Sequence, residues 1–166
     1  MIKLEALLKM KQEDRYKYML IVLEGQLSSE KDSLANLCNA TAIIKTAMEG
    51  VNWAGFYILK KNYLVLGPFQ GLLACNRIEI GKGVCGAAVY EKKLICIEDV
   101  HLFPGHIACD SASNSEIVIP IINCDKIYGV LDVDSPEKGR FGQLEEKYLI
   151  KFMEKLNNYI NWEKIK

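Results

Sequence analysis

Three of the six cysteines stand in expected loops or at a loop-to-helix junction: Cys75, Cys85 and Cys109. A thiol in such a place can meet a ligand, and the amides at a helix N-terminus can favour the nucleophilic thiolate. No two cysteines have the short spacing that zinc fingers and thioredoxin-like motifs require. A structural zinc site is therefore disfavoured, which leaves redox chemistry or plain packing for these three thiols.

The other three cysteines are predicted to be core residues. Cys38 lies on the apolar stripe of an expected helix, and Cys96 and Cys124 lie in or beside apolar strand segments. A free cysteine in such surroundings behaves as a small hydrophobic residue.

Three carboxylates form a second set of candidates. Asp132 and Asp134 are two residues apart in an expected strand, so their side chains share one face. Like charges repel, so at least one should have a raised pKa if this face is partly buried, leaving a protonated acid near neutral pH. Glu116 opens a neighbouring apolar strand and could complete the set. A carboxylate metal site, or a strand end exposed to water, are the other interpretations.

Aromatic residues mark one face of the strand that follows Gly50. Alternation places Trp53, Gly55 and Tyr57 on one face and only apolar residues on the other. The aromatic face could form the wall of a small-molecule pocket, although an ordinary aromatic core gives the same pattern.

The periodicity of apolar residues predicts the elements that position these groups. Helices are expected over 16–27, 34–48, 84–91 and 144–160, and strands over 51–59, 63–66, 94–98, 117–122 and 127–134. Ser28 or Ser29 can cap the second helix. Helices at both ends with hairpins between them predict an α+β fold, an antiparallel sheet covered by a helical layer.

Composition narrows the class of protein. The chain has 166 residues, enough for one domain over 1–166, and 50% of them are hydrophobic. Lys plus Arg equals Asp plus Glu at 21 each, which argues against nucleic acid as a partner. No stretch has the apolar length of a membrane span or the pattern of a signal peptide, so we expect no membrane association and a cytoplasmic protein with reduced cysteines.

Several motifs resemble those of the free methionine-(R)-sulfoxide reductases, enzymes built on a GAF domain. They span 50–141, the expected catalytic core, and include NWAGFY at 52–57, GKGVCGAA at 81–88, FPGHIACD at 103–110 and GVLDVDSP at 129–136. The resemblance implies a single GAF domain, with the terminal helices on one face of a central antiparallel sheet and a ligand pocket on the other.

The resemblance also implies roles for the candidate residues. Cys109 matches the catalytic cysteine, Cys75 the resolving cysteine and Cys85 a third cysteine that assists. Pocket aromatics and substrate-holding carboxylates are matched by the remaining residues: Trp53, Tyr57, Glu116, Asp132 and Asp134.

The reaction implied is reduction of free L-methionine-(R)-sulfoxide, a product of oxidative stress. It proceeds through a sulfenic acid on Cys109 and a disulfide with Cys75. Thioredoxin or a similar dithiol is the expected reductant, no cofactor or metal is required, and a homodimer is expected.

Two alternatives remain at this point. A noncatalytic GAF module that senses a small ligand would share the fold. A metal site of His101, His106 and Cys109 would use the same loop.

Overall fold

The computed structural model describes residues 6–7, 9–105 and 111–165. The helices are α2 (Gln12–Ser29), α3 (Ser33–Ala47), α4 (Gly83–Glu91), the 3-10 helix η1 (Val100–Leu102), α5 (Gln143–Tyr159) and α6 (Trp162–Ile165). The strands are β1 (Trp53–Lys60), β2 (Tyr63–Gln70), β3 (Arg77–Glu79), β4 (Ile95–Ile97), β5 (Ser115–Asn123) and β6 (Lys126–Ser135). The predicted α+β class is confirmed.

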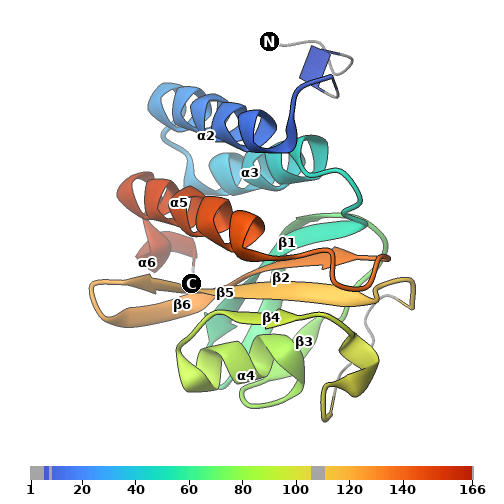
Figure 1. Ribbon diagram of the computed structural model, residues 1–166. Coiled ribbons are helices and arrows are strands. Elements are labelled where there is room, and N and C mark those ends of the chain that lie inside the picture. Colours follow the sequence, from blue (N-terminus) through green and yellow to red (C-terminus); the bar gives the residue numbers. More distant parts are fainter. Residues whose placement is uncertain (1–5, 8, 106–110, 166) are drawn as a thin grey trace.

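One antiparallel sheet runs through the molecule in the order β3-β2-β1-β6-β5-β4 (Figure 1). The first and last strands in the sequence, β1 and β6, are therefore its two central neighbours. Both carry the alternation that the sequence showed, so each contributes one row of side chains to each face of the sheet.

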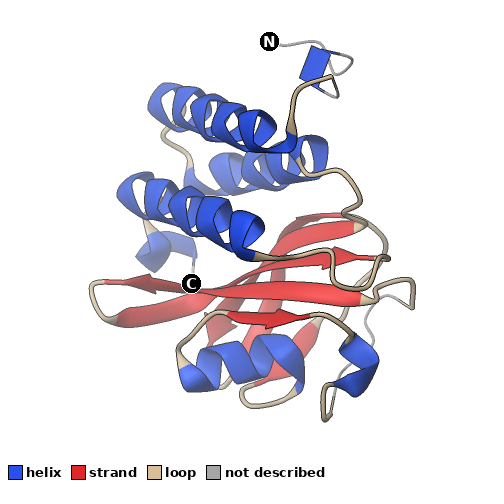
Figure 2. Ribbon diagram, in the orientation of Figure 1, coloured by secondary structure: helices blue, strands red, loops and turns tan. Residues whose placement is uncertain are grey.

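Helices α2, α3 and α5 form a layer over one face of the sheet, and α4 lies on the opposite face (Figure 2). The face under the helical layer is apolar and includes the buried side chains of Phe56, Ile117, Leu131 and Val133. The predicted arrangement, with terminal helices on one face only, is confirmed. The face toward α4 carries a second, smaller apolar cluster that includes Trp53, Tyr57 and Val118.

A buried hydrogen-bond network around the Arg140–Glu145 ion pair joins the start of α5 to α2. The Arg140 guanidinium lies 2.9 Å from Glu145 Oε1, and both side chains are about nine-tenths buried. The Tyr16 hydroxyl donates to the same oxygen of Glu145 at 2.8 Å, and Arg140 also donates to the backbone carbonyl of Glu49. These contacts fix the helical layer against the chain that enters β1.

Several local predictions were wrong. The N-cap of α3 is Asp32, whose carboxylate accepts from the Ala35 amide, while Ser28 and Ser29 belong to α2. The short strand β3 lies in a segment expected to be loop. Two cysteines expected in the core, Cys38 and Cys124, are exposed, and Cys96 is half-buried.

Among the described residues, no helix combines the length and apolar character needed to cross a membrane.

Candidate active site

Strand register brings the three candidate carboxylates together on the face that α4 covers. Glu116 of β5 is the cross-strand partner of Asp134, and Asp134 is also paired with Trp53 of β1. Asp132, two residues earlier on β6, is paired with Gly55 of β1. Cross-strand partners project to the same face of a sheet, so the carboxylates and the aromatic row of β1 share one face.

A cysteine from α4 joins this cluster. Cys85 lies in the first turn of α4, which packs against β5 and β6, and its Sγ donates to Glu116 Oε1 at 3.9 Å. The Cys85 sulfur and one oxygen each of Glu116 and Asp132 all lie within 4.8 Å of one another. We call these three residues, all buried, the thiol–carboxylate cluster. Asp134 is half-buried beside it.

Burial dominates the electrostatics of the cluster. Loss of hydration raises the pKa of Asp132 to about 7, even though hydrogen bonds with Cys85 and Glu116 oppose the shift. Burial, followed by the charges of Asp132 and Asp134, raises the pKa of Glu116 well above its usual range. The cluster therefore holds at least one carboxylic acid proton at neutral pH. A raised pKa for one of the two aspartates was predicted from their mutual repulsion, but burial and not the charge of Asp134 raises that of Asp132.

The expectation of an activated thiolate is wrong for Cys85. Its position at the start of α4 favours the charged form, but burial and the charges of Asp132 and Glu116 raise the pKa of the thiol well above its usual value. Desolvation and like-charged neighbours thus outweigh the helix end. Cys85 is a neutral thiol near neutral pH.

The aromatic side chains of the face stack on one another. The Trp53 ring lies 5.4 Å from the Phe69 ring and 5.9 Å from the Tyr57 ring, with interplanar angles of 16° and 24°. Gly55 makes this possible, because a Cβ there would lie 2.5 Å from the Trp53 ring and 2.5 Å from Phe69 Cβ. The predicted aromatic face therefore exists and includes Phe69, whose place in it the sequence did not reveal, while its role as the wall of a pocket stays a prediction.

Both predicted pocket aromatics also hold the loop between β2 and β3. Trp53 Nε1 donates to the Leu72 carbonyl at 3.2 Å, and the Tyr57 hydroxyl donates to the Cys75 carbonyl at 3.0 Å. Burial, with the charge of Asp132 next, raises the pKa of Tyr57 far above its usual value, so the phenol stays a donor. Alternation along β1 predicted the face of these rings but gave no signal for these hydrogen bonds.

The cysteines fall into two groups. Cys75, half-buried in this loop, is disulfide-bonded, whereas Cys38, Cys85, Cys96 and Cys124 are free. Cys109, the predicted nucleophile, lies outside the described residues.

One member of the alternative metal site can be located. His101 lies in η1, and its Nε2 is 3.0 Å from the side-chain oxygen of Asn114. His106 and Cys109 lie outside the described residues, so this alternative stays open.

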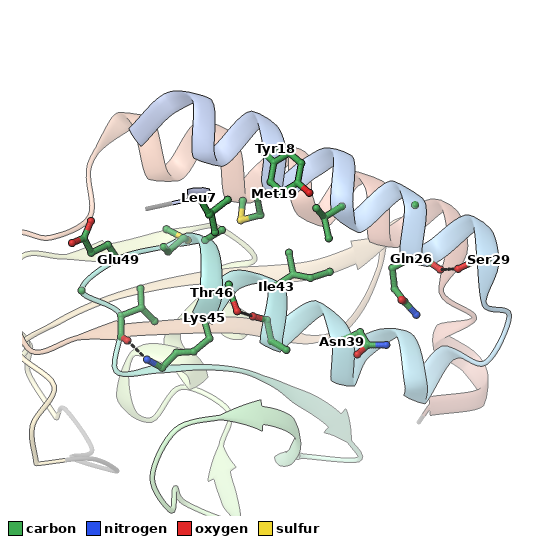
Figure 3. A pocket seen from close by; sticks show the side chains of 17 residues that line it. Leu7, Tyr18, Met19, Gln26, Ser29, Asn39, Ile43, Lys45, Thr46 and Glu49 are labelled. Carbon is green, nitrogen blue, oxygen red and sulfur yellow. Dashed lines mark hydrogen bonds between the residues drawn. The ribbon is translucent and has the colours of Figure 1, made fainter. Parts of the chain in front are cut away.

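A hollow of about 1030 Å³ opens on the helical layer, on the other side of the sheet from the cluster (Figure 3). It lies between α2 and α3 and is lined by apolar side chains such as Met19 and Ile43, while Lys45 donates to the Val51 carbonyl at its edge. None of the predicted site residues lines it. The titratable groups that chemistry needs are on the α4 face, so we assign the candidate active site there.

Comparison with known proteins agrees with this architecture. Residues 40–159 match the family described as GAF domain. The chain belongs to the GAF domain family.

Individual relatives narrow the assignment. The chain is 54% identical to Protein YtsP of Bacillus subtilis, over 87% of this chain and 90% of that protein. It is 48% identical to the free methionine-R-sulfoxide reductase of Escherichia coli, over 81% of each. The solved structure of the free methionine-R-sulfoxide reductase of Neisseria meningitidis, in complex with its substrate, matches with a TM-score of 0.88 at 38% identity and covers 93% of both chains. The resemblance to the free methionine-(R)-sulfoxide reductases predicted from the motifs is confirmed.

Proposed function

We propose that this protein reduces free L-methionine-(R)-sulfoxide to methionine, with Cys109 as the nucleophile. The observation that carries the proposal is the thiol–carboxylate cluster: buried acids that retain protons near neutral pH, facing an aromatic wall. Such a face suits a small zwitterion that carries a polar sulfoxide. The relatives named as reductases of this substrate support the same conclusion.

The first half-reaction needs an acid as well as a thiol. A sulfoxide oxygen leaves poorly until it is protonated, so an acid must serve the oxygen while the thiolate attacks sulfur. Glu116 and Asp132 are suited to donate because burial raises the pKa of each carboxyl. Asp134, less buried, is suited to pair with the substrate ammonium. Attack forms an S–S bond between Cys109 and the substrate sulfur, and the protonated oxygen leaves as water. Water then attacks the Cys109 sulfur and breaks this bond, which releases methionine and leaves a sulfenic acid on Cys109, so the substrate gains two electrons and the thiol loses two.

Resolution would follow at the β2–β3 loop. The Cys75 thiol attacks the sulfenic sulfur, an S–S bond forms and water leaves. An external dithiol such as thioredoxin then reduces the disulfide and becomes oxidised itself. Cys75 is disulfide-bonded, whereas Cys38, Cys85, Cys96 and Cys124 are free, and this difference supports a resolving role for Cys75. The Tyr57 hydrogen bond to its carbonyl would hold the loop in place.

The remaining site residues have supporting roles in this scheme. Trp53 and Tyr57 form the wall against which the methyl and methylene groups of the substrate pack. Cys85 assists as a neutral thiol that donates to Glu116 and so adjusts the acid next to the sulfoxide. A pocket that reads free amino and carboxyl groups would reject a sulfoxide inside a polypeptide.

The test is turnover of purified protein with a dithiol reductant, using free L-methionine-(R)-sulfoxide, the (S) epimer and a peptide-bound sulfoxide in separate reactions. We expect consumption of the free (R) epimer alone. Cys109→Ser should abolish turnover but retain substrate binding, and Cys38→Ser, at an exposed cysteine of α3, is the matched control that should keep full activity. Binding without turnover by the wild-type protein would instead favour the sensing module.

Three further parts of the proposal concern the setting. Exposed free thiols at Cys38 and Cys124 fit a reducing compartment, so we place the protein in the cytoplasm. A homodimer through the helical layer is supported by exposed Ile21 on α2 and Ile150 on α5, and light scattering would measure it. The GAF domain is proposed to span 1–166, with its catalytic core at 50–141.

A further inference from the structure

The thiol–carboxylate cluster has the donor set and the spacing of a metal site. The Cys85 sulfur lies 3.9 Å from Glu116 Oε1, and the third donor, from Asp132, lies within 4.8 Å of both. In a tetrahedral zinc site, with Zn–S near 2.3 Å and Zn–O near 2.1 Å, the sulfur and a carboxylate oxygen are about 3.5 Å apart. Side-chain rotations that move the donor atoms by up to about 1.5 Å would therefore complete the geometry.

One atom of the cluster lacks a partner. Asp132 Oδ1 is buried and accepts no hydrogen bond from any part of the chain that the structure describes. The whole residue is 6% exposed. A buried carboxylate oxygen without a donor is costly, and a bound cation would satisfy it.

The electrostatics of the cluster also favour a cation. Three acidic groups share one buried site, and burial raises the pKa of each. The charges of Asp132 and Asp134 raise the pKa of Cys85 and of Glu116 further. Bound protons remove the repulsion between the negative charges of these acids. A divalent cation can replace the protons and have the same effect. On binding, the Cys85 thiol proton and the carboxyl protons would pass to solvent, leaving a thiolate and two carboxylates around one dication.

We propose that Cys85, Glu116 and Asp132 form a binding site for one thiophilic divalent cation, Zn²⁺ or Cd²⁺, with the fourth coordination position open. The thiolate selects these ions over Mg²⁺ and Ca²⁺, which prefer all-oxygen sites. Half-buried Asp134, the cross-strand neighbour of Glu116, marks the end of the cluster nearer to solvent and hence the entry side. Because the same carboxylates serve the proposed substrate, the cation and the sulfoxide exclude each other; this last clause alone rests on the proposed function.

Cobalt is the probe for the test. Fully reduced, metal-free protein is titrated with Co²⁺, and the near-ultraviolet thiolate-to-cobalt charge-transfer band and the visible bands of tetrahedral cobalt are recorded. Zn²⁺ is then added in competition, and calorimetry gives the stoichiometry. We expect one ion per chain, displacement of cobalt by Zn²⁺ and no displacement by Mg²⁺.

Variants identify the ligands. Cys85→Ser should lose the charge-transfer band, and Asp132→Asn should keep the band but bind at least tenfold more weakly. Cys38→Ser is the matched control, an exposed cysteine that should leave the titration unchanged. The titration is repeated on Cys109→Ser protein, where the band should persist, and near-ultraviolet circular dichroism verifies that each variant is folded.

Two results would overturn the inference: a folded wild-type protein that takes up no cobalt, or a band and affinity that survive in folded Cys85→Ser. Neither measurement involves turnover, so failure of the metal site leaves the reductase proposal intact. Conversely, an inactive protein that still shows the Cys85-dependent band would refute only the proposed function. Where turnover is observed, Zn²⁺ should raise the apparent KM for the sulfoxide and leave kcat unchanged.

Discussion

Replacing Asp132 by asparagine keeps the shape of the side chain and removes its titration, so the substitution isolates the energetic effect of the buried acid. Burial raises the pKa of Asp132 from 3.8 to about 7 in the folded protein. The folded state therefore binds more protons than the unfolded state between these two values. The contribution of Asp132 to the free energy of unfolding is therefore greatest below pH 3.8, and it falls as the pH rises toward 7.

The size of the effect follows from linkage. One pKa unit corresponds to about 1.4 kcal/mol, and the two pKa values of Asp132 imply that the wild-type protein loses about 2 to 3 kcal/mol of unfolding free energy between pH 5 and pH 8. Glu116, whose pKa is also raised, adds to the loss in the same direction. In Asp132→Asn the stability profile should be flatter by at least about this amount, because the Asp132 titration is removed. Glu116 also loses a like-charged neighbour, which reduces its own contribution.

Urea unfolding at pH 5, 6, 7 and 8, with a reductant present so that no disulfide contributes, measures both profiles. Asp125→Asn is the matched control, since it makes the same change in the exposed β5–β6 turn and should run parallel to the wild-type protein. Parallel profiles for wild-type and Asp132→Asn would refute the reasoning, because they would mean that Asp132 is not held protonated by its surroundings.

Three other substitutions test the supports of the site and the fold. Gly55→Ala places a Cβ 2.5 Å from the Trp53 ring, so we expect a loss of about 1–3 kcal/mol in thermal unfolding and a raised KM for the sulfoxide; unchanged values would contradict the close packing. Tyr57→Phe removes the hydrogen bond to the β2–β3 loop, which should cost about 1 kcal/mol and slow disulfide formation, as followed by quenched alkylation, more than substrate binding; an unaltered rate would count against the positioning role. Arg140→Met leaves the buried Glu145 carboxylate without its cation and should cost about 3–5 kcal/mol in urea unfolding, part of which Glu145→Gln should restore in the double variant.

The sequence predicted the two central strands well because their patterns are strict. In β1 and β6 the residues that point to one face are nearly all apolar. A register shift of one position would therefore turn the carboxylates toward the apolar core under the helical layer. That is why Asp132 and Asp134 could be assigned to one face, with Trp53 and Tyr57 on the corresponding face of β1. The motif resemblance added the GAF fold and the placement of the terminal helices on one face of the sheet, which periodicity alone does not give.

Other features depend on contacts that no local pattern encodes. Cys38 fits an apolar stripe of α3, but the helix turns Leu37 and Ala40 inward and leaves Cys38 in solvent. The thiol of Cys85 was expected to ionise from its place at a helix start, and the opposing carboxylates come from strands more than thirty residues away in the sequence. Strand β3, only three residues long, is too short for alternation to be visible.

The position of β1 and β6 in the middle of the sheet has a consequence for how the molecule opens. Amides of central strands exchange with solvent only when the whole domain unfolds, whereas edge strands open in smaller fluctuations. Asp132 and Asp134 of β6, with Trp53 and Tyr57 of β1, are thus built on the strands expected to exchange most slowly. Cys75 lies in the loop before β3, the strand at one edge of the sheet, so a partner can reach its sulfur through a local opening that leaves Asp132 and Glu116 in place.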